Sequence, residues 1–225
     1  MRVSTKQLVV SYKYVLTQPI VVGSGNNIIS KWLTYVDSFF KEGGRGLFVS
    51  PIFLSKGKYC YAQFHVDIDD CDINKVSDSE WDSFLNFCFN KELYPVFTGK
   101  RGLHILSNFL VRVPLVLTRD FSKHVRSYVW NKIKLNPDYL AELVGGRVDV
   151  PLSTTRQPTP RLGWRQDVRN FIIPILQDSV LAKNLPLLKS LIADPDKKTV
   201  GEKLQKLIDV ETYLKNYVIP KRIIA

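Results

Sequence analysis

Apolar and polar residues alternate at the end of the segment 59–68, where Phe64, Val66 and Ile68 are separated by polar residues. Side chains of a strand point alternately to opposite faces, so this period of two predicts a strand with one buried face. Two further apolar runs, 95–97 and 103–106, predict strands joined by the glycine-containing loop 98–102. The sequence therefore contains at least one predicted hairpin.

A helix is predicted after residue 77 by its start signal and its periodicity. Ser77 and Glu80 have the spacing of a capping box, in which each side chain bonds the backbone amide of the other. Apolar residues then recur at helical spacing, namely Trp81, Phe84, Leu85 and Cys88. Further helices are predicted at about 119–134, from 136 to a stop at 145–146, and from 179 onward.

Short strands are also predicted at 148–150 and 171–176, with an irregular stretch at 151–163 between them. Strands and helices thus alternate irregularly, with no visible internal repeat. This order, with at least one hairpin, is typical of a mixed α/β or an α+β fold.

Composition excludes several classes of protein. The chain has 225 residues, 45% of them hydrophobic and 24% charged, as in an ordinary globular protein, which argues against global disorder or a coiled-coil rod. No apolar run is long enough for a membrane span, and the first residues lack the pattern of a secretory signal, so we expect no membrane partner and a cytoplasmic location. The three cysteines form no CxxC pair, which argues against a zinc site built from cysteine pairs.

The positive charge is concentrated in one part of the chain. The formal net charge is +11, and residues 95–170 hold 13 Lys and Arg against 5 Asp and Glu. Residues 60–92 instead hold 8 acids and 2 bases. An excess of basic residues favours a polyanionic partner, with nucleic acid ahead of a membrane surface, although a solvated basic surface is the alternative.

Asp67 and Asp69 are the first candidates for chemistry. Strand positions two apart share a face, so these two carboxylates point together while Val66 and Ile68 face the core. Such carboxylates repel one another unless a cation lies between them, and hard oxygen ligands suit Mg²⁺ or Mn²⁺. The alternative is a strand that runs into an acidic, helix-capping loop.

The loop between the two predicted hairpin strands is the second candidate. Its residues are Thr98, Gly99, Lys100, Arg101, Gly102, Leu103 and His104. Two glycines let the backbone approach an anion closely, and Lys100 and Arg101 add positive charge. The alternative is a basic hairpin turn with an incidental histidine.

A lone acid and a group of arginines follow. Asp149 lies between two valines of a short predicted strand and has value as a third carboxylate, because two-metal sites commonly use three. Four arginines then stand in a proline-containing loop with few acids nearby: Arg156, Arg161, Arg165 and Arg169. They have the character of phosphate contacts, with a solvated loop as the alternative.

Taken in order, these motifs resemble the archaeo-eukaryotic primase superfamily, which includes the small catalytic subunit of replicative primase. The resemblance covers roughly residues 60–165: an Asp-x-Asp pair, a glycine loop ending in histidine, and a later lone aspartate. Thr98 stands where that family usually has serine, and Arg161-Leu162-Gly163 replaces a longer family motif. The cysteine cluster that binds zinc in many small subunits is missing.

The resemblance implies a role for each of these residues. Asp67, Asp69 and Asp149 would hold two catalytic Mg²⁺ or Mn²⁺ ions. The nucleoside triphosphate would be bound by Thr98, Gly99, Lys100, Arg101, His104 and Arg161. The expected contacts of template DNA, inferred from charge and not from the resemblance, are Arg156, Arg165 and Arg169. The implied fold is an RRM-like antiparallel catalytic sheet packed with an N-terminal α/β unit and flanking helices, with a catalytic core at 1–178 and a helical extension at 179–225.

The sequence therefore leads to the hypothesis of a DNA primase or primase-polymerase, an enzyme that joins nucleoside triphosphates on a single-stranded DNA template. A primase large subunit or a helicase is the expected protein partner. The alternative is a non-catalytic nucleic-acid-binding replication subunit of the same fold. A metal-dependent phosphodiesterase is a third interpretation.

Overall fold

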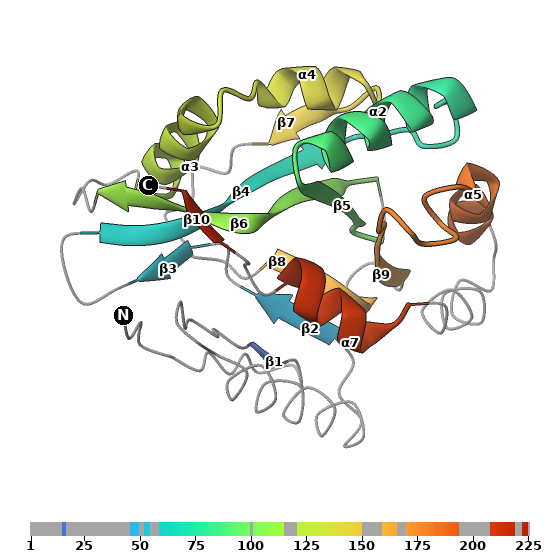
Figure 1. Ribbon diagram of the computed structural model, residues 1–225. Helices are drawn as coiled ribbons and strands as arrows, with labels where there is room; N and C mark the ends of the chain where they lie inside the picture. The colour runs from blue at the N-terminus through green and yellow to red at the C-terminus, as the bar shows by residue number, and fades with distance from the viewer. Residues whose placement is uncertain are drawn as a thin grey trace.

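A computed structural model describes residues 15–16, 46–49, 52–54, 59–99, 101–114, 121–149, 159–165, 170–193, 208–218 and 222–224. Within these segments the chain forms a mixed α+β fold around one continuous sheet (Figure 1). The predicted α+β class is confirmed at this level. No helix in these segments is both long and apolar enough to cross a membrane.

The centre of the sheet has the chain order βαββααβ. Its strands are β4 (Tyr59–Asp69), β5 (Leu93–Phe97), β6 (Leu103–Pro114) and β7 (Arg147–Asp149). Its helices are α2 (Asp78–Asn90), α3 (Phe121–Lys132) and α4 (Pro137–Glu142). The strands lie in the order β5-β6-β4-β7, every neighbouring pair antiparallel, which is the arrangement of the split βαβ motif.

Further strands extend this sheet on both sides. β3 (Ile52–Leu54) pairs with β4, and β9 (Asn170–Pro174) pairs with β5. Beyond β9 lie β8 (Thr159–Arg165), β2 (Gly46–Val49) and β1 (Val15–Leu16). The C-terminal part contains α5 (Leu185–Ala193), α7 (Val210–Tyr213), the π-helical turn η1 (Leu214–Val218) and β10 (Arg222–Ile224).

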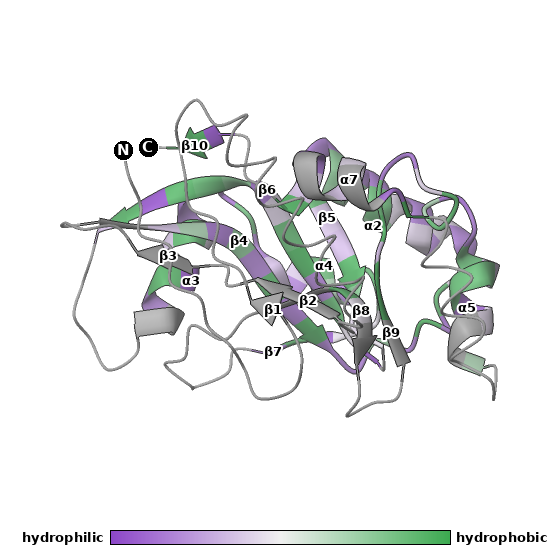
Figure 2. Cartoon of the chain, turned by 90° about the horizontal axis from the view of Figure 1, so that it is seen from below, coloured by the Kyte–Doolittle hydropathy of each residue, from purple (hydrophilic) through white to green (hydrophobic). Residues whose placement is uncertain are grey.

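The alternation of β4 produces its two different faces. Phe64, Val66 and Ile68 are at most 1% exposed and belong to the hydrophobic core, whereas Asp67 and Asp69 are only half-buried. Figure 2 shows hydrophobic residues along most of β6, the neighbour of β4. Polar side chains on one face of β4 are thus held in place by apolar packing on the other.

Several predicted elements are confirmed. Ser77 is the N-cap of α2 with a complete capping box to Glu80, and Asn136 caps α4 just before its first-turn proline. The strand predicted at 59–68 is β4, and the predicted hairpin is formed by β5 and β6.

Two features differ from the sequence predictions. The stretch predicted to be irregular at 151–163 contains most of strand β8, which pairs with β2 and β9. Pro160 and Gly163 interrupt the alternation of apolar and polar residues by which a strand is predicted. The strand therefore depends on its pairing with β2 and β9 and not on its own periodicity. The predicted helical extension also ends in a strand, because β10 pairs in parallel with β6.

Candidate active site

Asp67 lies at the meeting point of three strands. It is directly opposite His104 of β6 on one side and Asp149 of β7 on the other. Directly opposed residues of antiparallel strands project to the same face, so these three side chains share one face of the sheet. The His104 Nε2 atom lies 3.0 Å from Asp67 Oδ1, whereas His104 Nδ1 is buried and has no hydrogen-bond partner among the described residues.

Asp69 belongs to the same group of carboxylates. It stands two positions after Asp67 in β4 and therefore shares its face. Burial raises the pKa of Asp69 above its ordinary value, and the neighbouring charges of Asp67 and Asp149 raise it further, while Arg147 acts in the opposite direction. The carboxylates of Asp67, Asp69 and Asp149, here called the carboxylate cluster, are thus close enough to repel one another.

The donor chemistry of the carboxylate cluster fits a hard divalent cation, because three carboxylates supply only oxygen ligands. The three carboxylates are not already arranged around one common point. Across the described parts of the chain, no group of three or more His, Cys, Asp and Glu residues is gathered closely enough to hold a metal ion. The strand register places the three acids on one face of the sheet. Their side chains must change orientation before all three can bind one ion.

The predicted anion loop packs against the end of β4. The hydroxyl of Thr98 donates to the Gly102 carbonyl, and the Cys71 amide donates to the Arg101 carbonyl. A Cβ atom at Gly102 would lie 2.8 Å from Thr98 Oγ1 and 3.5 Å from Asp69 Oδ1. An added methyl group would therefore crowd the Thr98 hydroxyl within the loop, whereas its distance from Asp69 is that of an ordinary contact.

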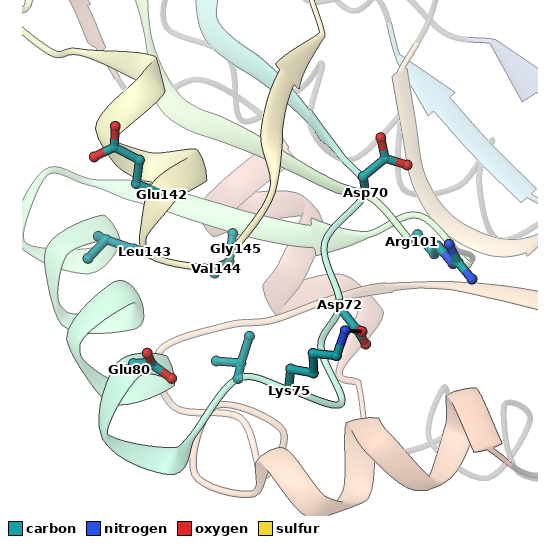
Figure 3. A pocket seen from close by; sticks show the side chains of 10 residues that line it. Asp70, Asp72, Lys75, Glu80, Arg101, Glu142, Leu143, Val144 and Gly145 are labelled. Carbon is teal, nitrogen blue, oxygen red and sulfur yellow. Dashed lines mark ion pairs between the residues drawn. The ribbon is translucent and has the colours of Figure 1, made fainter.

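Arg101 lies at a separate, strongly charged pocket of about 540 Å³ (Figure 3). Two of its acids form ion pairs: Asp72 pairs with Lys75 at 3.0 Å, and Asp70 accepts from Arg147 Nε at 2.7 Å. Asp70 has positive φ and stands at the bend after β4, so it does not continue the face of Asp67. The pocket is therefore distinct from the carboxylate cluster, although it begins where β4 ends.

The remaining predicted contacts are only partly described. Lys100, Arg156 and Arg169 lie outside the described residues. Arg161 and Arg165 belong to strand β8 and not to the loop predicted for them, and their side chains are outside the description.

Helix α3 brings to this region two residues that belong to none of the predicted motifs. The Trp130 indole Nε1 donates to the His65 carbonyl at 3.2 Å. Arg126, four residues earlier, is influenced by the charges of both Asp67 and Asp149. Arg126 and Trp130 are four residues apart and therefore lie on the same side of α3. This spacing does not indicate which strand that side of the helix packs against.

Comparison of the chain with protein-family models, curated proteins and solved structures finds no significant match in any of the three.

Proposed function

We propose that this protein is a template-directed nucleotidyltransferase of the primase or primase-polymerase type, which joins nucleoside triphosphates on a single-stranded DNA template. The observation that carries the proposal is the position of Asp67, which is opposite Asp149 and His104 at once. Two acids and a histidine from separate motifs thereby meet at one point of the sheet. Repulsion between such closely placed acids destabilises the fold, which supports a functional reason for their position.

The side chains have complementary roles in this proposal. Asp67, Asp69 and Asp149 would hold Mg²⁺ or Mn²⁺, which when bound supplies activation of the attacking 3′-hydroxyl and charge stabilisation of the leaving pyrophosphate. His104 would orient Asp67 through its Nε2 atom, which lies 3.0 Å from Asp67 Oδ1, and is also a proposed contact of the triphosphate. The loop of Thr98 to Gly102 would bind the triphosphate through backbone amides and the charge of Lys100, with Arg101 contributing its charge from the adjacent pocket that begins where β4 ends.

The fold is compatible with a primase-type core. The split βαβ order places β6 and β4 in the middle of the unit β5-β6-β4-β7, with His104 on β6, Asp67 and Asp69 on β4, and Asp149 on the neighbouring β7. The basic character of residues 95–170 supports binding of template DNA, with Arg156, Arg165 and Arg169 as proposed contacts and Arg161 on the triphosphate. A large subunit or helicase would complete the assembly.

Nucleotide incorporation on single-stranded DNA in the presence of Mn²⁺ or Mg²⁺ tests the proposal. Asp67→Asn and Asp149→Asn keep side-chain size but remove a charge, and we expect each to lower incorporation at least ~100-fold. Asp82→Asn, the same change at an exposed position of α2, serves as the control and should leave incorporation within about twofold of wild type. Wild-type incorporation by either cluster variant would exclude these residues as metal ligands.

A non-catalytic nucleic-acid-binding subunit is the second candidate. It is favoured by the finding that no described group of acids, histidines and cysteines is already gathered to hold an ion. Salt-dependent DNA binding without incorporation, alone or with partner subunits, would support it. Metal-dependent strand cleavage without nucleoside triphosphate would instead indicate a phosphodiesterase.

A further inference from the structure

Helix α3 approaches β4 at an interruption in the pairing of that strand. On the edge of β4 away from β6, β3 pairs with residues 60–62 and β7 pairs with residues 67–69. Between them, the Trp130 indole donates to the carbonyl of His65 at 3.2 Å. The hydrogen bond fixes α3 beside the interruption, next to the point where Asp67 and Asp149 face each other.

Arg126 is one helical turn before Trp130 and so lies on the same side of α3. Its Nε atom is buried and has no hydrogen-bond partner among the described residues. Burial lowers the pKa of Arg126, whereas the charges of Asp67 and Asp149 raise it. The guanidinium is therefore a partly desolvated cation in the field of two carboxylates.

The two kinds of charge compensate each other. A buried cation without an opposite charge is unfavourable, and so are neighbouring carboxylates without a cation. Arg126 therefore supplies a positive charge close to Asp67 and Asp149 when no metal ion is bound. The same guanidinium repels a divalent cation that enters the cluster.

We infer that Arg126 is the resident counter-charge of the Asp67–Asp149 pair, positioned by Trp130, and that it lowers the affinity of the carboxylate cluster for divalent cations. The part that concerns metal affinity rests on the proposed function. The part that concerns the metal-free protein does not. Trp130 is thus the positioning residue, and Arg126 acts through its own charge.

Thermal unfolding in EDTA at neutral pH tests the counter-charge. Arg126→Met removes the charge and keeps much of the apolar stem, and we expect it to lower Tm. Adding Asp149→Asn should restore part of that loss, and Arg126→Lys should retain most of the wild-type Tm. Lys132→Met, the same loss of charge at an exposed position of α3, is the matched control and should leave Tm nearly unchanged. Equal Tm values for Arg126→Met and Lys132→Met would overturn the inference.

Titration calorimetry with Mn²⁺ tests the effect on metal binding. Removing a nearby positive charge should tighten Mn²⁺ binding by Arg126→Met about fivefold, because close charges interact strongly in a partly buried site. Arg126→Lys and Lys132→Met should bind within about twofold of wild type. Unchanged or weaker binding by Arg126→Met would overturn the inference.

The two measurements separate this inference from the proposed function. A wild-type protein that neither binds Mn²⁺ nor incorporates nucleotides would contradict the proposed function and the inferred effect of Arg126 on metal affinity. The unfolding experiment in EDTA would still show whether Arg126 is the counter-charge of Asp67 and Asp149. Should Arg126→Met be unfolded in EDTA, we expect Mn²⁺ to restore its fold by replacing the missing cation. Failure to fold with and without Mn²⁺ would overturn the counter-charge.

Discussion

Asp67 and Asp149 face each other directly across the antiparallel strands β4 and β7. Like charges in directly opposed positions destabilise a sheet, and Asp69 adds a third carboxylate on the same face. His104 bonds one of these acids, and Arg126 supplies a cation nearby. The three carboxylates therefore repel one another, and a divalent cation bound between them would reduce this repulsion.

The pKa of Asp69 predicts a dependence of stability on pH. Burial and neighbouring carboxylates raise that pKa above 3.8, so the folded protein holds this proton to higher pH than the unfolded chain. Ionisation of Asp69 therefore opposes folding. Its contribution lowers the free energy of unfolding as the pH rises from 3.8 through the folded-state pKa. Asp69→Asn should raise Tm in EDTA at pH 7 by roughly 2 °C or more, and this gain should shrink as the pH falls toward 3.8.

Thermal unfolding of both proteins across this pH range is the measurement. Asp82→Asn on the exposed surface of α2 should give no comparable gain. A lower Tm for Asp69→Asn at pH 7 without metal would show that the Asp69 carboxylate stabilises the fold.

A substitution of His104 tests the link between the glycine loop that precedes it and the Asp67–Asp69 pair. His104→Ala removes the contact to Asp67 Oδ1 and should reduce nucleotide incorporation at least ~100-fold while far-UV circular dichroism stays that of the wild type. His124→Ala is the control, because His124 is exposed on α3. Similar single-turnover rates for the two variants would remove His104 from the site.

Gly146 controls the placement of β7. A Cβ atom there would lie 2.7 Å from Ile68 Cγ2 and 2.9 Å from the Asp69 carbonyl oxygen. Gly146→Ala should therefore lower the free energy of unfolding by about 2–3 kcal/mol, because this crowded contact must separate. It should also reduce incorporation, since β7 carries Asp149.

Gly145→Ala is the matched control for this prediction. Gly145 has φ +61° but no atom within 4 Å of an added Cβ, so alanine there is disfavoured by conformation alone. Its loss should be about 1 kcal/mol, measured by urea unfolding. A loss for Gly146→Ala no larger than that for Gly145→Ala would show that the contact with β4 accommodates a methyl group.

The parts predicted well from sequence depend on interactions between residues close in the chain. Alternation of apolar residues defined β4 and placed Asp67 and Asp69 on one face. Ser77 and Glu80 defined the start of α2 through bonds that span only three residues. These signals are local, so the tertiary structure is not needed to interpret them.

The parts that escaped prediction depend on distant partners. Strand β8 contains Pro160 and Gly163, which obscure its pattern, and it exists through pairing with β2 and β9. Arg126 gave no signal in the sequence beyond a basic residue on a helix. Its relation to Asp67 follows from the hydrogen bond between Trp130 and β4.

The sequence by itself determined the elements of the central unit, the α+β class and the chemical nature of the candidate residues. Only the tertiary structure decided that Asp149 and His104 flank Asp67, that Arg126 lies beside them, and that Arg101 faces a different pocket. Periodicity and caps act within a few residues, whereas strand register is fixed by the packing of the whole sheet. The distances between charges therefore depend on register, and register is a property of the fold as a whole.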